Sequence, residues 1–318
     1  MDWIMRTVAI TGISGYIGTQ LLCHLDGMDS VQRIIGIDVR QPTFESSKLR
    51  FYCQDILEPF SGLFVENKVD TALHLAFVSR PTRNRTLAKQ IDVEGTINFI
   101  RACQQANAKH ILYLSSHTVY GAHQDNPIPL HECSRLRPLP DFQYSWDKAQ
   151  AEQILRDFGK SAPNITITIL RSCPVIGPHA ADSAPALMFK PPVMIGVAGF
   201  DPPMQFVHED DLVRLIGVFL THRKGGIFNV AGDGELTYSE VARLVSKKMM
   251  RLPRRLLEFI MLISWAMHLQ NDSPPSGLEF IKYPPLISTE KLRREIGFRF
   301  QYSTREALSS FVSYVKTR

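Results

Sequence analysis

Short apolar runs alternate with longer segments of helical periodicity through the first half of the chain. The runs are nearly continuous in Val, Ile and Leu, which is typical of strands whose two faces are both covered by helices. Strands that alternate with helices favour parallel pairing through helical crossovers. The pattern therefore predicts an α/β fold with a doubly wound parallel sheet, whose first five strands lie at 7–10, 33–37, 48–52, 69–75 and 109–114.

Two long helices and a further strand continue this pattern. We expect the helices over 87–105 and 145–158, and a β-branched strand over 165–170. The chain then changes character, because 174–203 is rich in Pro, Ala and Gly and 274–285 is rich in Pro. These two stretches predict loops and short elements that fold over the edge of the sheet.

The segment 256–269 is almost wholly apolar and follows Arg251, Arg254 and Arg255. A cationic flank beside an apolar helix would also suit a helix that lies on a membrane surface. The segment is too short to span a bilayer about 30 Å thick, and it contains Glu258 and His268. We therefore expect a helix that is buried in the second half of the chain, or that forms a subunit contact, rather than a membrane contact.

Composition excludes several classes of protein. The 36 Lys and Arg residues exceed the 31 Asp and Glu residues by only five, and the charges are spread along the chain. We therefore expect no nucleic-acid partner. The five cysteines form no CxxC pair, and no His pairs with another His or Cys at zinc-ligand spacing. Neither a disulfide framework nor a metal site is expected.

The N-terminus runs directly into an apolar segment and a glycine-rich turn, without a small-residue cleavage site. This predicts a first strand rather than a signal peptide, and hence a cytoplasmic location. The two N-x-[ST] matches, at Asn164 and Asn271, would then be chance matches.

A glycine-rich turn follows the first predicted strand. Gly12, Gly15 and Gly18 are spaced as GxxGxxG, and Tyr16 and Ile17 lie between the last two at the start of a predicted helix. Glycine lets the backbone approach a pyrophosphate, whose charge is met by free N–H groups at the helix N-terminus. Since tight turns use glycine for conformational reasons too, the motif gains weight only from its position between a strand and a helix.

An acid at the end of the second strand strengthens this prediction. Asp38 lies 20 residues after Gly18, the offset of about 20 expected for a carboxylate that binds a cofactor ribose. A carboxylate there would repel a 2′-phosphate, so NAD is favoured over NADP. Arg40 could bind that phosphate instead if its side chain turned inward.

Tyr144 and Lys148 stand four residues apart at the start of a predicted helix, and so share one face. A Tyr side chain has a pKa of about 10, and an ammonium at about 4 Å supplies roughly the 4 kcal/mol that lowers it by three units. The spacing alone is common in amphipathic helices. It gains meaning from Ser115 and Ser116, where an apolar strand ends in hydroxyl residues at the sheet edge that binds ligands in open α/β sheets.

Several ordered motifs together resemble the extended short-chain dehydrogenase/reductase family of the NAD-dependent epimerase/dehydratase type. The resemblance covers nearly the whole chain and is carried by TGxxGxxG at 11–18, HLA at 74–76, GTxN at 95–98, SSxxVYG at 115–121, YxxxK at 144–148, Gly177-Pro178, FVH at 206–208 and FNVAG at 228–232. It implies a Rossmann domain over 1–173, to which a strand near 227–231 returns, and a mainly substrate-binding portion over 174–318. A homodimer is also implied.

The resemblance also assigns roles to residues. It implies that Tyr144 is the general acid/base, that Lys148 lowers its pKa and holds the nicotinamide ribose, and that Ser116 hydrogen-bonds the substrate oxygen. The remaining residues implied to lie along the cofactor are Asp55 and Ile56 beside adenine, and Leu75, Ala76 and Phe77 near the central phosphates and ribose.

Two departures bear on the substrate and the site. Asp92 stands where the family often has Asn, and a carboxylate cannot donate as an amide does. The later segments offer no clear arginine clamp for a diphosphate, which disfavours a nucleotide sugar. We therefore expect a small secondary alcohol, ketone or sugar-type substrate. Net dehydrogenation and epimerisation stay open, as does the alternative of a non-catalytic cofactor-binding sensor or assembly subunit.

Overall fold

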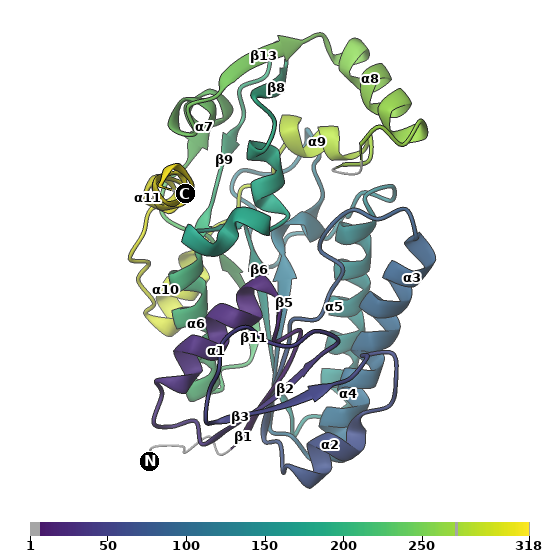
Figure 1. The fold of residues 1–318 in the computed structure, drawn as a ribbon, viewed down its shortest axis with the longest axis vertical. Helices are drawn as coiled ribbons and strands as arrows, with labels where there is room; N and C mark the ends of the chain where they lie inside the picture. The colour runs from purple at the N-terminus through teal and green to yellow at the C-terminus, as the bar shows by residue number, and fades with distance from the viewer. Residues whose placement is uncertain (1–6, 271–272, 318) are drawn as a thin grey trace.

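The computed structural model describes residues 7–270 and 273–317. Residues 1–6, ahead of the first strand, and Asn271 lie outside these ranges. A seven-stranded sheet forms the centre of the molecule, in the order β11-β6-β5-β4-β1-β2-β3, and all its pairings are parallel (Figure 1). Its strands are β1 (Thr7–Thr11), β2 (Arg33–Asp38), β3 (Leu49–Cys53), β4 (Thr71–His74), β5 (His110–Ser116), β6 (Thr166–Ser172) and β11 (Gly226–Val230). The predicted doubly wound fold is confirmed.

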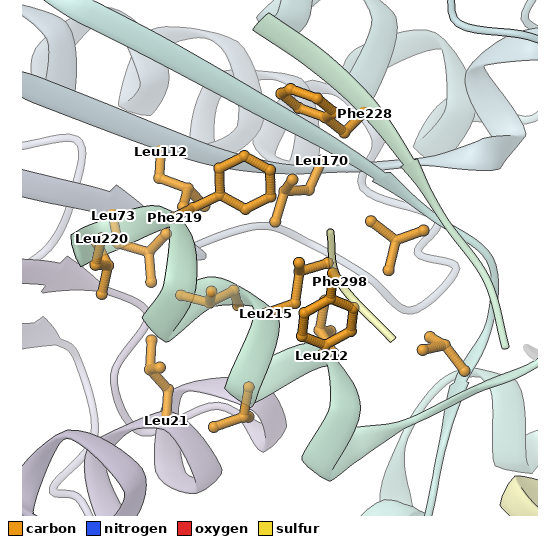
Figure 2. Packing of buried hydrophobic residues seen from close by; sticks show 14 of the residues in the cluster. Leu21, Leu73, Leu112, Leu170, Leu212, Leu215, Phe219, Leu220, Phe228 and Phe298 are labelled. Carbon is orange, nitrogen blue, oxygen red and sulfur yellow. The ribbon is translucent and has the colours of Figure 1, made fainter. Parts of the chain in front are cut away.

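Helices cover both faces of the sheet. One face packs against α1 (Tyr16–Asp26) and α6 (Glu209–His222). Figure 2 shows leucine and phenylalanine side chains from this layer against residues of the strands. The other face packs against α2 (Ser61–Glu66), α4 (Gly95–Gln105) and α5 (Gln143–Ser161). Fully burying a Leu or Phe contributes about 1.5–3 kcal/mol, so these two layers supply most of the stability that holds the sheet edge in place.

The predicted helix over 87–105 consists of three consecutive pieces. They are α3 (Arg85–Lys89), a π-helical turn η1 (Gln90–Glu94) and α4. A π-helical turn inside an α-helix is rare and is frequently found at functional sites. Here it carries the buried Asp92. Periodicity alone did not predict this turn, because one wide turn changes the hydrophobic spacing very little.

The second half of the chain forms short elements above the sheet and partly returns to it. Because β11 joins the sheet and α6 packs beside α1, the segments 1–173 and 174–318 both contribute to the central sheet and the helices that cover it. The domain boundary at residue 173 therefore stays a prediction. The remaining elements are η2 (His117–Tyr120), β7 (Val175–Ile176), η3 (Pro178–Asp182), η4 (Pro185–Phe189), β8 (Val193–Val197), β9 (Pro203–Met204), β10 (Val207–His208), β12 (Leu236–Thr237), α7 (Tyr238–Leu244), β13 (Lys248–Leu252), α8 (Arg254–Ala266), α9 (Gly277–Lys282), α10 (Glu290–Ile296) and α11 (Thr304–Lys316).

The expectation of a buried helix over 256–269 is wrong. The helix α8 is present, but Leu257 is the only buried residue among its thirteen residues. The side of α8 that carries Leu257 packs against the small apolar cluster of Val197 and Leu278, whereas most of the other apolar side chains of α8 face outward. Within the described ranges, no helix has both the length and the apolar character that crossing a membrane requires.

Candidate active site

The glycine-rich turn lies at the edge of the sheet where β1, β4 and β5 end, which we call the carboxyl rim. Gly12 has a φ of +74°, and a Cβ there would lie 2.5 Å from the backbone nitrogen of Ala76. A Cβ on Gly18 would clash with the Gly12 carbonyl. Gly15 caps α1, whose first turn contains Tyr16, Ile17 and Gly18. The turn therefore leaves backbone N–H groups open toward the rim, as a pyrophosphate requires.

Asp38 lies beside this turn at the end of β2. Its carboxylate accepts hydrogen bonds from the backbone N–H of Ser14, at 3.0 Å, and of Arg40, at 3.1 Å. The Arg40 side chain is exposed, with its Nε 4.0 Å from the Asp38 carboxylate. The acid is thus held next to the glycine turn, where a cofactor ribose would reach it.

Asp55 and Ile56 follow β3, whose last residue, Cys53, pairs with Asp38. Asp55 is exposed and accepts the N–H of Leu57, whereas Ile56 is buried against Gly95. The amide of Asn98 donates to the carbonyls of both Ile56 and Leu57. The GTxN motif therefore has a physical role, because it fixes the backbone of this stretch of the rim.

The three predicted catalytic residues come together at the carboxyl rim. Ser116 ends β5, and its hydroxyl lies close enough to the Tyr144 phenol on α5 to lower the pKa of that phenol. Lys148 lies one turn further along α5, and its Nζ donates to the Leu114 carbonyl at 2.6 Å. That nitrogen lies 3.7 Å from the centroid of the Phe77 ring. A phenol, a hydroxyl and an ammonium thus share one partly enclosed site.

The stretch after β4 borders this site. Leu75 donates its N–H to the Thr11 carbonyl at 3.0 Å, which continues the pairing of β4 with β1. Ala76 then passes close to Gly12. The Phe77 ring packs edge-on against the Tyr144 ring, with centroids 5.7 Å apart. The residues predicted to line the cofactor are therefore next to both the glycine turn and the catalytic residues.

The protonation states differ from the sequence-based expectation. Burial raises the pKa of Tyr144 to about 12, while the neighbouring Ser116 hydroxyl lowers it and the charge of Asp92 raises it. Burial also lowers the pKa of Lys148 to about 7, against the opposing charges of Asp92 and Glu152. Burial is the largest cause of the shift in the Tyr144 pKa, because removing the phenolate from water disfavours the charged form. The predicted lowering of the Tyr144 pKa is not present in this state.

Asp92, the departure from the family pattern, is buried beneath the rim. Its carboxylate accepts the Val78 N–H at 2.7 Å, and its carbonyl accepts the Thr96 hydroxyl at 2.6 Å. Burial raises the pKa of Asp92 to about 8. The Asp92 carboxylate accepts a hydrogen bond as the oxygen of an Asn amide would. Because its pKa is raised, Asp92 stays protonated to a higher pH than an ordinary Asp.

A buried ionic network supports β5, α5 and β6 below the rim. Arg171 pairs with Glu152, and its guanidinium also donates to the Tyr120 hydroxyl at 2.9 Å. Tyr120 in turn donates to Asn229 at 2.7 Å. Arg171, Tyr120 and Asn229 all lie in or beside the family motifs, but the motifs alone gave them no role. Buried charges need such complete pairing, because removing one partner leaves the other unpaired.

A second cluster joins the glycine turn to the second half of the chain and was not predicted from the sequence. The Tyr16 hydroxyl donates to Glu209, which is fully buried at the start of α6. The same carboxylate contacts His179 Nδ1 at 2.5 Å. An acid directly after the FVH motif was the available signal. Its partner could not be found from sequence, because Tyr16 and Glu209 are 193 positions apart.

Comparison with known proteins supports this description of the fold. Residues 8–231 match the NAD dependent epimerase/dehydratase family. Over 314 residues the chain is 26% identical to an uncharacterized protein of Mycobacterium tuberculosis, covering 96% of this chain and 83% of the relative. It is 29% identical over 188 residues to the UDP-glucose 4-epimerase of Yersinia enterocolitica, covering 54% of each protein.

Solved structures show the same fold. The dTDP-glucose 4,6-dehydratase DesIV of Streptomyces venezuelae, solved with NAD bound, superposes with a TM-score of 0.75 at 20% identity, covering 98% of this chain and 97% of that one. The UDP-glucose 4-epimerase of Thermotoga maritima superposes with a TM-score of 0.75 at 18% identity, covering 98% and 99%. At these identities the likeness establishes the fold alone.

The family match covers most of the chain and includes the glycine turn, the Ser116 strand end and the Tyr144 helix. It favours an enzyme over a non-catalytic cofactor-binding subunit, and the predicted cofactor, NAD, is the one on which the family depends. The chain belongs to the NAD-dependent epimerase/dehydratase family and is an enzyme of the extended short-chain dehydrogenase/reductase type.

Proposed function

We propose that this enzyme oxidises a secondary alcohol carbon of a sugar-type substrate and, in an epimerase or dehydratase reaction, reduces the same molecule again. One observation carries the proposal: the Tyr144 phenol lies beside the Ser116 hydroxyl at the carboxyl rim, one helical turn from Lys148 and next to the glycine turn. A proton-moving group beside a cofactor cradle is what alcohol oxidation needs.

The residues of the rim fit NAD. The turn formed by Gly12, Gly15, Tyr16, Ile17 and Gly18 would hold the pyrophosphate, and Asp38 would bind the adenosine ribose. Asp55 and Ile56 would flank the adenine, and Leu75, Ala76 and Phe77 would line the path to the reactive end. When bound, NAD supplies the hydride acceptor that this chain's own side chains lack.

The side chains of the site then divide the proton chemistry. The Ser116 hydroxyl holds the substrate oxygen and stabilises the negative charge that develops on it. The Tyr144 phenolate accepts the proton of the substrate hydroxyl as the carbon loses its hydride, and the phenol returns the proton when the carbonyl is reduced. The Lys148 ammonium favours the phenolate, and its low pKa of about 7 lets it exchange protons near neutral pH.

Relatives support a sugar-type substrate. One is named a UDP-glucose 4-epimerase and another a dTDP-D-glucose 4,6-dehydratase. Because the sequence shows no clear arginine clamp for a diphosphate in the later segments, we name the sugar-type alcohol and not a nucleotide. A family of epimerases and dehydratases favours return of the hydride to the substrate over net release of reduced cofactor.

The test is turnover by purified protein with NAD and a panel of secondary alcohols, free sugars, UDP-glucose and dTDP-glucose, with products identified by mass spectrometry. We expect Tyr144→Phe to bind NAD within about threefold of wild type and to lose roughly 10²- to 10⁴-fold in turnover. Tyr52→Phe, which removes a phenol hydroxyl bonded to Asn67 away from the rim, is the matched control and should behave as wild type.

Two outcomes would reject parts of the proposal. Equal turnover by wild type and Tyr144→Phe on the same substrate would remove Tyr144 from the chemistry. A steady rise in the absorbance of reduced nicotinamide during turnover would instead show net dehydrogenation, and would contradict return of the hydride.

A further inference from the structure

The helix α8 carries an apolar stripe that faces solvent. Leu256, Phe259, Ile260 and Ile263 of α8, together with Met267 directly after it, recur at the spacing of one helix face, and we call them the α8 face. Phe259 is 60% exposed, Leu256 45%, Ile260 43% and Met267 64%. Ile263 is half-buried, and the other four are exposed. Apolar side chains scattered singly on a surface are ordinary, but several exposed apolar side chains on one helix face mark an interaction site.

The opposite side of α8 holds the helix to the rest of the protein. Leu257 and Met261 pack into the apolar cluster with Val197 and Leu278. Further along, the Arg83 guanidinium stacks 4.4 Å from the centroid of the Trp265 ring and donates to its carbonyl at 2.7 Å. Because α8 is already anchored by this side, the α8 face is left free for something outside the chain.

The residues that lead into α8 are strongly basic. Between 243 and 257 there are six cations and no acid, although charges are mixed along most of the chain. These cations, which we call the basic segment, are Arg243, Lys247, Lys248, Arg251, Arg254 and Arg255. Within the described part of the chain, Arg251 and Arg254 have ion-pair partners, whereas Lys247, Lys248 and Arg255 have none.

The basic segment also shapes the surface beside α8. Arg243, Lys247 and Arg251 line a hollow of about 460 Å³ between α7 and β13. On the adjoining strands, Met250 of β13 and Ile195 of β8 are exposed apolar residues. Figure 1 shows α7, β8, β13 and α8 at the same end of the molecule. Cations and exposed apolar groups therefore share one end.

We propose that this end of the protein docks on an anionic lipid surface, with α8 lying in the interface. An amphipathic helix binds a bilayer through buried apolar area together with attraction of its cations to anionic lipids, and this end offers both. A helix of thirteen residues is about 20 Å long and lies on a bilayer without spanning it. This reverses the sequence-based expectation, which rested on the short length of the segment and on the presence of Glu258 and His268.

A second copy of the chain fits this surface less well. A two-fold contact through the α8 face would bring two basic segments together, and the only acid between 243 and 270 is Glu258, which already pairs with Arg254. Like charges across an interface oppose association, whereas anionic lipid headgroups neutralise them.

The experiment is vesicle flotation of the full-length protein with NAD present. Vesicles of phosphatidylglycerol and phosphatidylcholine in equal parts are compared with vesicles of phosphatidylcholine alone, at low and at high salt. We expect wild type to float with the anionic vesicles at low salt and to be released by high salt. The variant Lys247→Gln, Lys248→Gln, Arg255→Gln should lose roughly a hundredfold in partitioning, since each basic residue near the surface contributes about fivefold.

The apolar contribution is tested separately. The variant Leu256→Gln, Phe259→Gln, Ile260→Gln should no longer float, and the single variant Phe259→Gln should float less. The matched control is Val65→Gln, Val315→Gln, which changes two equally exposed helical residues elsewhere and should float as wild type. All positions are exposed, so folding should survive, and circular dichroism and NAD affinity verify it.

Three results would overturn the proposal. The first is failure of the wild-type protein to float with anionic vesicles, and the second is flotation of the α8 face variant equal to that of wild type. The third is a dimer, measured by light scattering, that the α8 face variant alone disrupts, in a protein that does not bind vesicles. The last would assign the surface to a second copy of the chain. None of these results bears on Tyr144, so the proposed reaction is tested independently.

Discussion

The Lys148 ammonium lies over the Phe77 ring, with its nitrogen 3.7 Å from the ring centroid. Phe77 comes from the stretch after β4 and Lys148 from α5, so the pair links two elements of the carboxyl rim. The ring face and the Leu114 carbonyl together hold the ammonium, and the nearest carboxyl groups act on it only through their charge. Neither the ring nor the carbonyl is an anion, so they hold the ammonium without pairing its charge. The charge of the ammonium can therefore still act on Tyr144.

Phe77→Leu should therefore weaken catalysis. A cation over an aromatic ring gains about 0.5–2 kcal/mol, so we expect turnover on a reactive panel substrate to fall roughly 2- to 30-fold. Phe77→Tyr keeps the ring face and is the control, with turnover expected near that of wild type. Steady-state kinetics at saturating NAD measures both. Wild-type turnover by the leucine variant would mean that the ring does not help to hold the ammonium.

Asp92→Asn should stabilise the protein most at alkaline pH. Because the pKa of Asp92 is raised to about 8 in the folded protein, its burial becomes a penalty as pH rises from the ordinary Asp value through 8. The amide removes that penalty, so the variant should gain about 1 kcal/mol or more over wild type at pH near 9, and less near pH 5. Urea unfolding at the two pH values measures the difference.

The same substitution should move the pH dependence of turnover. The charge of Asp92 raises the pKa of Tyr144, so its removal should shift the alkaline rise in activity toward lower pH. Asp157→Asn, at an exposed position on α5, is the control, and it should change neither the pH dependence of turnover nor the pH dependence of stability. An Asp92→Asn variant whose stability changes equally at both pH values would contradict a raised pKa.

Gly12→Ala should damage cofactor binding. Gly12 has a φ of +74°, and a Cβ there would lie 2.5 Å from the Ala76 nitrogen, so the turn or the stretch after β4 must move. We expect a loss of about 1–3 kcal/mol of stability and a rise of at least about tenfold in the Kd for NAD. Calorimetric titration and thermal unfolding measure the two effects.

Gly62→Ala provides the matched control for that substitution. Gly62 lies in α2, and no neighbouring atom lies within 4 Å of the position that a Cβ would take, so Ala should fit and stabilise the helix by about 0.5–1 kcal/mol. NAD affinity should stay unchanged. An equal effect of the two substitutions on NAD binding would show that the Gly12 turn is not part of the cofactor cradle.

Stability should fall on acidification below about pH 6.5. Burial lowers the pKa of His74 to about 3 and those of His110 and His117 to about 4. Between these values and the unfolded pKa of about 6.5 the unfolded state binds more protons, so the folded state loses stability as pH falls through that range. Over the full range the loss is about 3 kcal/mol for His110 and for His117, and about 5 kcal/mol for His74, at about 1.4 kcal/mol for each unit of pKa.

Urea midpoints measured from pH 7 to pH 4 test this prediction. His110→Gln should reduce the slope by up to one proton, although it also alters the hydrogen bond to Thr168. His131→Gln, at an exposed position, should leave the slope unchanged. A profile that is flat between pH 7 and pH 5 would show that the buried histidines take up protons in the folded state.

The amino-acid sequence by itself determined the order of strands and helices, the glycine turn and the position of Asp38. It also determined that Tyr144 and Lys148 lie one turn apart, because helix spacing is local. The carboxyl ends of parallel strands meet at one edge of the sheet, so the pattern alone could place Ser116 near Tyr144 and Lys148. These features depend on a few neighbouring residues and on strand direction.

Only the tertiary structure decided the protonation of Tyr144, the contact of Lys148 with Phe77 and the pairing of Tyr16 with Glu209. It also decided which side of α8 is covered: the almost wholly apolar segment 256–269 predicted a buried helix, but only the side that carries Leu257 and Trp265 packs against the rest of the protein. The physical reason is common to all of these. Desolvation and burial depend on what distant segments place around a side chain, and a local pattern does not contain that information.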